Sequence, residues 1–234
     1  MWIKICGITS LEDAKVAVHA GADAVGFVFA ASPRRVTPEG VRGITKELPS
    51  SVQKIGVFVD ASADDIVATC ETARLTGVQL HGEYSPAHLT QVRMRIKENV
   101  LPVLIVHVVP YDGDSARFAR QLQSLAALPV TADDPIVVLV DTRVGDKVGG
   151  TGIPFDWAAA QDVFLRHAGS IRLIAAGGLD PENVRQAIQT MRPWGVDVSS
   201  GVESIPGRKD HQRVKQFIRA SRTAALEFAE AIQR

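Results

Sequence analysis

The chain has 234 residues, and 26 Lys and Arg balance 26 Asp and Glu, so its formal net charge is zero. This length suits one large domain, and a balanced charge argues against nucleic acid or an anionic membrane as a partner. Two cysteines make no disulfide framework, and no apolar run approaches the roughly 20 residues of a transmembrane helix. We therefore expect a soluble, cytoplasmic protein; the charge balance leaves a small anionic ligand possible, because such a ligand needs only a local site.

Short runs rich in Val and Ile alternate along the chain with longer amphipathic segments. Several runs are apolar at successive positions, which is typical of strands covered on both faces of a parallel sheet. In chain order, the predicted strands are Trp2–Cys6, Ala24–Phe29, Gln53–Val59, Val78–His81, Val103–Val109, Ile136–Asp141, Ile171–Ala175 and Val196–Ser199. The predicted helices are Leu11–Ala20, Pro38–Leu48, Ser62–Leu75, Pro86–Asn99, Asp114–Leu125, Phe155–His167, Pro181–Met191 and Lys209–Ile232.

This alternation of strands and helices allows either a closed barrel or an open doubly wound sheet. The count of eight and the chain length favour the barrel, since such a barrel typically needs about 250 residues. No composition break or linker divides the chain. The sequence therefore predicts one α/β domain over residues 1–234, a (β/α)₈ TIM barrel.

Polar residues that close apolar strands are the candidates for a site, because active sites of such barrels lie at the carboxyl ends of the strands. Cys6 ends the first strand, His81 the fourth and Asp141 the sixth. Arg35 follows the second strand, and a guanidinium matches a carboxylate ligand. The structural alternatives are a cysteine packed as a small hydrophobe, a histidine in the core, a loop-anchoring aspartate and a solvated arginine.

Small residues follow the last two predicted strands. Gly177 and Gly178 come after the seventh strand, and Ser200 and Gly201 after the eighth. Such ends let backbone N–H groups approach an anion, although a single Gly-Gly pair also occurs in ordinary tight turns. Two such ends on the last two of eight strands indicate a phosphate site.

Side-chain alternation along the first strand places Lys4 inside the barrel, one layer below Cys6, and turns Ile3 and Ile5 toward the helices. Asp197 projects inward from the eighth strand by the same rule, and the eighth strand neighbours the first in a closed barrel. Lys4 and Asp197 are therefore predicted to pair. Burying such a pair is costly unless it is well hydrogen-bonded.

Taken together, the motifs resemble the phosphoribosylanthranilate isomerase family of tryptophan biosynthesis. The resemblance runs in the family's order from residue 3 to about 210. Its segments are Lys4–Thr9, Gly21–Phe29, Gly56–Val59, Val78–Gly82, Asp141–Thr142, Gly149–Gly152, Phe155–Trp157, Gly177–Leu179, Asp197–Glu203, Pro206–Gly207 and Lys209–Asp210. The segment from 93 to 134 and the tail are longer than in the family, so a C-terminal helical extension is expected from about residue 221.

The resemblance implies an Amadori rearrangement of a phosphoribosyl aminoaldose to an aminoketose. Cys6 falls on the family's general base and Asp141 on its general acid. Arg35 falls on the arginine that holds the anthranilate carboxylate, with Arg34 as the alternative register. Acid–base catalysis of this kind needs no metal or other cofactor. It requires Cys6 as a thiolate and Asp141 with a proton.

Two rival functions remain open at this point. The related histidine-pathway barrel performs the same rearrangement on another phosphoribosyl substrate, but has an aspartate where Cys6 stands. A non-catalytic phosphate-binding barrel would explain the glycine ends but not Cys6 and Asp141. In each case we expect a small phosphorylated ligand, no nucleic-acid or membrane partner, and a monomer or homodimer.

Overall fold

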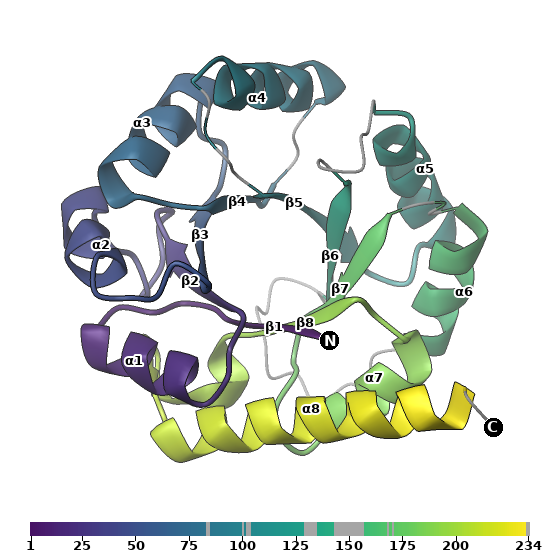
Figure 1. The fold of residues 1–234 in the computed structure, drawn as a ribbon. Coiled ribbons are helices and arrows are strands. Elements are labelled where there is room, and N and C mark those ends of the chain that lie inside the picture. The colour runs from purple at the N-terminus through teal and green to yellow at the C-terminus, as the bar shows by residue number, and fades with distance from the viewer. Residues whose placement is uncertain are drawn as a thin grey trace.

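Eight parallel strands form a closed barrel in the computed structural model, and they follow one another around it in sequence order (Figure 1). The structure describes residues 1–82, 85–99, 101, 104–128, 135–142, 157–167, 169 and 171–232. The strands of the barrel are β1 Trp2–Ile5, β2 Ala24–Val28, β3 Gln53–Phe58, β4 Gly77–Leu80, β5 Leu104–Tyr111, β6 Val137–Thr142, β7 Arg172–Ala175 and β8 Gly195–Val198.

Helices of the described part of the chain surround the barrel as an outer ring (Figure 1). They are α1 Leu11–His19, α2 Pro38–Thr45, α3 Ala63–Ala73, α4 Pro86–Glu98, α5 Ser115–Ala126, α6 Trp157–His167, α7 Val184–Met191 and α8 His211–Ile232. The predicted (β/α)₈ barrel is confirmed. The predicted ends at Val103 and Phe155, and the motif Gly149–Gly152, lie outside the described residues.

Two predicted helix starts are wrong. Residues 181–183 form a turn before α7, because Asp180 accepts backbone hydrogen bonds from Glu182 and Asn183 at 2.9 and 2.8 Å. Lys209 does not begin the last helix. It lies in β10 Arg208–Lys209, which pairs antiparallel with β9 Glu203–Ile205 after a short 3₁₀ helix, η1 Ser200–Val202.

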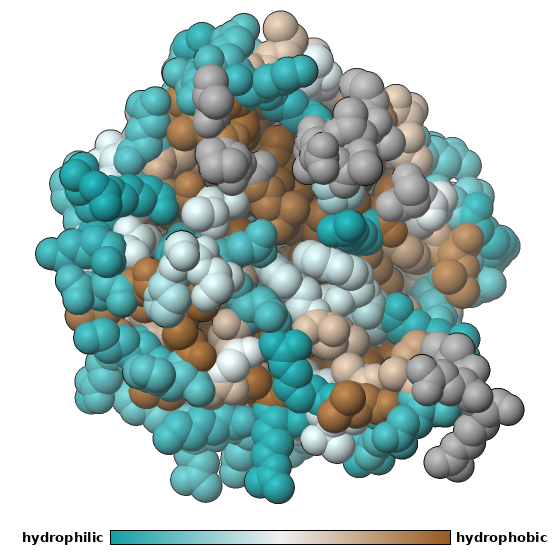
Figure 2. All heavy atoms as spheres, in the orientation of Figure 1, coloured by the Kyte–Doolittle hydropathy of each residue, from teal (hydrophilic) through white to brown (hydrophobic). Residues whose placement is uncertain are grey.

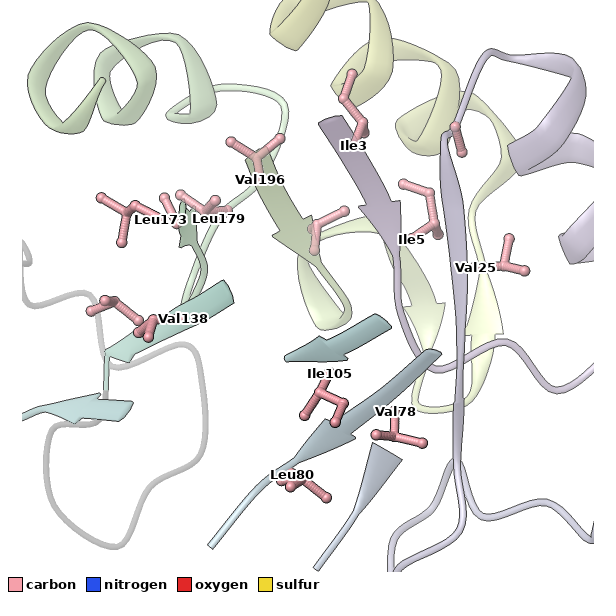
Figure 3. Packing of buried hydrophobic residues seen from close by; sticks show 14 of the residues in the cluster. Ile3, Ile5, Val25, Val78, Leu80, Ile105, Val138, Leu173, Leu179 and Val196 are labelled. Carbon is pink, nitrogen blue, oxygen red and sulfur yellow. The ribbon is translucent and has the colours of Figure 1, made fainter. Parts of the chain in front are cut away.

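Alternation along the strands divides the core into two layers. An outer layer lies between the barrel and the helices, and Figure 3 shows some of its members, among them Ile3 and Ile5 of β1 and Val196 of β8. The inner layer fills the barrel with side chains of opposite parity; it comprises Trp2, Ala24, Ile55, Val106, Val108, Val137, Leu139, Ile174 and Ala176. Hydrophilic side chains gather around the rim of the molecule in Figure 2 and hydrophobic ones toward its middle. The side chains of the inner layer therefore fill the barrel as a packed core.

Short polar caps fix where the helices begin. The side chains of Ser10 and Thr37 accept hydrogen bonds from the backbone of the third residue after them, at the starts of α1 and α2. Pro38 opens α2, where its missing N–H costs no helical hydrogen bond. These caps end the loops that follow β1 and β2, and both loops contribute to the site described below.

The last helix, α8, is long and ties the chain ends together. Its Arg222 donates to the carbonyl of Gly21 at 2.9 Å and to the Asp23 carboxylate at 2.7 Å, and also to the carbonyl of Met1. Residues after about 221, expected as an extension, continue this helix without a break. None of the helices in the described part of the chain has the length and apolar character that crossing a membrane requires.

Candidate functional site

A cavity of about 500 Å³ opens at the carboxyl ends of the strands. Its described lining includes residues from the end of each of the eight strands. Six of the residues predicted from the sequence line it, namely Cys6, His81, Asp141, Gly177, Gly178 and Ser200. The structure therefore brings the predicted thiol, carboxyl group and glycine ends into one space.

Arg35 does not reach this cavity. Its side chain is exposed, while its backbone donates to the carbonyl of Ser32 at 3.0 Å and bridges to Val28 of β2. This hydrogen bond closes a turn over residues 32–35, so strand alternation does not govern the directions of the two arginines. Arg34, the alternative register, lines the cavity instead, so the assignment moves from Arg35 to Arg34.

Gly201 also lies outside the cavity lining. A Cβ built on it would lie 1.9 Å from the carbonyl oxygen of Leu179, closer than any side chain can approach. The glycine is needed because η1 packs directly against the chain that leaves β7. Gly201 therefore has a packing role, while Gly177, Gly178 and Ser200 lie at the cavity, and the phosphate site stays a prediction.

A buried ion pair lies in the barrel below Cys6. The Lys4 ammonium donates to Asp197 Oδ1 and to Gln79 Oε1, both at 2.8 Å, and its side chain is completely buried. Lys4 of β1 and Asp197 of β8 are direct partners in the strand register. The predicted pairing is confirmed, and Gln79 supplies the further hydrogen bond that such a buried pair needs.

This pair sets the charge around the thiol. Burial lowers the pKa of Lys4, but Asp197 and Cys6 together raise it by more, so the pKa lies above its usual value and Lys4 stays charged. Burial raises the pKa of Cys6, and Asp197 adds to this effect, whereas Lys4 and Lys209 oppose it. The net direction is upward. Cys6 is therefore a thiol at neutral pH when the cavity holds no ligand.

Gly26 of β2 provides the room that Cys6 and Lys4 occupy. A Cβ built on Gly26 would lie 2.8 Å from the Cys6 sulfur and 3.0 Å from Cε of Lys4. The thiol and the lysine stem therefore both press against the bare backbone of β2. Any larger residue here would displace them.

Four residues of this site were not singled out from the sequence: Gly26, Gln79, Glu203 and Lys209. Strand alternation was a sufficient signal for Gln79, which stands two residues before His81. Glu203 and Lys209 belong to a hairpin too short to show periodicity. Glu203 accepts from Arg34 and from Lys209, and so connects the β2 loop with the end of β8.

The family model described as N-(5'phosphoribosyl)anthranilate (PRA) isomerase matches residues 3–220 of the chain. The chain belongs to this isomerase family. Among similar proteins of the family, the isomerase of Geobacter sp. (strain M21) is 46% identical over 220 residues, covering 92% of this chain and 95% of the relative. That of Thermotoga maritima is 42% identical over 219 residues, covering 93% and 96%.

Solved structures of the isomerase family share the fold. A crystal structure of the enzyme from Thermotoga maritima matches with a TM-score of 0.80 at 39% identity, covering 95% of this chain and 99% of that one. Another, with a TM-score of 0.78 at 37% identity and the same coverage, is a complex with reduced 1-(o-carboxyphenylamino)-1-deoxyribulose 5-phosphate.

Proposed function

We propose that the chain is an N-(5'-phosphoribosyl)anthranilate isomerase of tryptophan biosynthesis. It would convert this aminoaldose to 1-(2-carboxyphenylamino)-1-deoxyribulose 5-phosphate by an Amadori rearrangement. The observation that carries the proposal is the meeting of Cys6 and Asp141, from the first and sixth strands, in one cavity with Arg34 and the glycine ends. The family membership favours this reaction over the related histidine-pathway rearrangement.

The chemistry needs one acid and one base. Asp141 protonates the ring oxygen of the ribose, the bond from that oxygen to C1′ breaks, and the anilino nitrogen forms a cationic Schiff base. The thiolate of Cys6 then takes the proton from C2′, which gives an enolamine. Protonation at C1′, with loss of the proton from the 2′-hydroxyl, turns the enolamine into the aminoketose, with no net oxidation or reduction. Such acid–base steps contribute roughly 10²–10⁴-fold each.

The rest of the cavity holds the two ends of the substrate. Arg34 would bind the anthranilate carboxylate through its guanidinium, as the charge and fork geometry of arginine allow. Gly177, Gly178 and Ser200 would hold the phosphate, because backbone N–H groups with small or no side chains can approach an anion closely. His81 would line the sugar between these two ends.

The state of Cys6 makes the reaction pH-dependent. Since burial raises the pKa of its thiol, only a small part of the free enzyme carries the reactive thiolate at neutral pH. We expect kcat/KM to rise with pH as Cys6 loses its proton, because kcat/KM reports the ionisation of the free enzyme. If kcat/KM instead fell as the pH was raised above neutral, this would argue against Cys6 as the base.

The proposal extends to the setting of the enzyme. A related structure shows monomers generated from the dimeric isomerase of Thermotoga maritima, which supports a monomer or homodimer for this chain as well. The two cysteines are buried and free, as in proteins that work in a reducing compartment, and a cytoplasmic location is consistent with this.

Turnover assays test this proposal. They use N-(5'-phosphoribosyl)anthranilate and the histidine-pathway aminoaldose as substrates, with the wild type, Cys6→Ser and Asp141→Asn. Asparagine is nearly isosteric with aspartate but cannot deliver a proton, so kcat should fall by roughly 10²–10⁴-fold with KM little changed. Asp64→Asn, on the exposed surface of α3, is the matched control and should retain full activity. An Asp141→Asn enzyme that keeps more than about a third of kcat would refute the assigned acid, and wild-type turnover of the histidine-pathway substrate alone would refute the proposed reaction.

A further inference from the structure

Arg34 is held by one edge of its guanidinium. Its Nε and Nη2 donate to the two carboxylate oxygens of Glu203, at 2.7 and 2.6 Å. A guanidinium has five N–H donors in a fixed plane. This contact uses the side edge and leaves the end edge, between Nη1 and Nη2, for a second ligand. Nη1 makes no hydrogen bond to any residue that the structure describes.

Glu203 is itself fixed from behind. Its side chain is only 4% exposed, and it also accepts from Lys209 Nζ at 2.9 Å. The side chain of Lys209 is fully buried. Its Nζ also donates a hydrogen bond to the carbonyl of Ser199, at 3.0 Å, at the end of β8. Arg34 and Lys209 lower the pKa of Glu203 more than burial raises it, so the carboxylate is ionised.

Backbone walls leave the arginine stem little freedom. Gly7 adopts a φ of +75°, and a Cβ on it would lie 2.6 Å from Cδ of Arg34. A Cβ on Gly207, in the hairpin between β9 and β10, would lie 3.0 Å from the carbonyl of Pro33. The loop after β1 and the hairpin after β8 therefore both press on the segment that carries Arg34.

We propose that Glu203 is a positioning residue that aims the free edge of Arg34 at the carboxylate of the substrate, and that Lys209 holds Glu203 in place. The proposal rests on the proposed function, in which Arg34 binds an aromatic ortho-carboxylate. It adds that selectivity for this carboxylate is set from β8, the strand whose end also carries Ser200 of the phosphate site. The segment that follows β8 would then position both the group that binds the carboxylate and part of the phosphate site.

The test is Glu203→Gln, which preserves size but places an amide N–H against the donors of Arg34. Charge-assisted hydrogen bonds are worth about 1.5–3 kcal/mol, so KM for the carboxylate-bearing substrate should rise roughly tenfold or more, with kcat little changed. Inhibition by ribulose 5-phosphate, which lacks the carboxylate, should change much less. Glu182→Gln is the matched control, because Glu182 forms a similar pair with Arg213 on the surface, and it should change neither constant.

A double-mutant cycle separates positioning from structural support. If Glu203 acts through Arg34, Glu203→Gln adds no further rise in KM in an Arg34→Met background. A full additional rise there, or equal weakening of ribulose 5-phosphate, overturns the proposal while leaving the proposed function intact. If the wild-type enzyme does not turn over the anthranilate substrate, both the positioning role of Glu203 and the proposed function are refuted.

A second substitution, Glu203→Asp, tests the same role in case Glu203→Gln does not fold. Glu203→Asp retains the charge beside Arg34 and Lys209 but withdraws the carboxylate by one methylene. It should give an intermediate KM at an unchanged unfolding midpoint. A wild-type KM in Glu203→Asp would show that the distance to Arg34 is unimportant, and would also overturn the proposal.

Discussion

Replacement of Gly26 by alanine tests how closely the position of the thiol governs the reaction. The added Cβ would lie 2.8 Å from the Cys6 sulfur and 3.1 Å from Cα of Cys6. Ordinary heavy-atom contacts begin at about 3.5 Å, so the thiol must move by about 0.7 Å or more. A misplacement of about 1 Å at a reacting group can cost roughly 10²-fold in rate. We expect Gly26→Ala to lower kcat by roughly ten- to a hundredfold.

The same change should leave substrate affinity nearly intact, because Arg34 and the glycine ends do not contact Gly26. Overpacking of this kind costs about 1–3 kcal/mol of unfolding free energy. Steady-state kinetics and urea unfolding measure the two effects separately. Iodoacetamide alkylation of Cys6 would report the displacement of the thiol directly.

Gly43→Ala provides the control for substituting a glycine. Gly43 is exposed on α2, and a Cβ on it would meet no atom within 4 Å. Alanine in such a helical position should raise the unfolding free energy by about 0.5–1 kcal/mol and leave kcat unchanged. If Gly26→Ala kept about half of the wild-type kcat or more, the placement of the thiol would not limit the rate.

Three further outcomes are expected. In a chain lacking the other cysteine, Lys4→Met should move alkylation of Cys6 by iodoacetamide to higher pH and Asp197→Asn to lower pH, and unmoved midpoints would make the pair purely structural. Gly178→Asn, at a left-handed position open to the cavity, should abolish competitive inhibition by inorganic phosphate, and an unchanged inhibition constant would remove Gly178 from the phosphate site. Buried His107 has a pKa of about 4 against 6.5, so the unfolded chain binds more protons between those values. The free energy of unfolding should therefore fall by up to about 3 kcal/mol as the pH drops from 6.5 to 4. Urea unfolding should show a smaller loss in His107→Leu, and the same dependence on pH in the variant and the wild type would contradict this.

Regular alternation is the part of this molecule that the sequence predicts well. The period of two along β1 and β8 was enough to place Lys4 beside Asp197, although they are 193 positions apart in the chain. A second rule, that polar residues closing the strands of a barrel meet at one opening, placed Cys6, His81 and Asp141 together. These inferences succeeded because each depends only on a residue's place within a strand.

Loops carry no such period, and there the sequence alone was insufficient. The choice between Arg34 and Arg35 depends on a turn at Ser32 that no repeating pattern reveals. The hairpin containing Glu203 and Lys209 has strands of only three and two residues, too short for alternation to be visible. The phosphate site was anticipated from glycines in general, but which glycine faces the cavity depends on how η1 packs.

The ion pair inside the barrel also bears on how the chain is made. Lys4 leaves the ribosome nearly two hundred residues before Asp197 does. Until β8 emerges, the lysine has neither its carboxylate nor the neighbouring strand that shields it from water. Closure between β1 and β8 is therefore a late, non-local step of folding, of the kind that slows folding and prolongs the exposure of unpaired strand edges. A nascent chain truncated before β8 would keep β1 at an open edge, with its lysine in water.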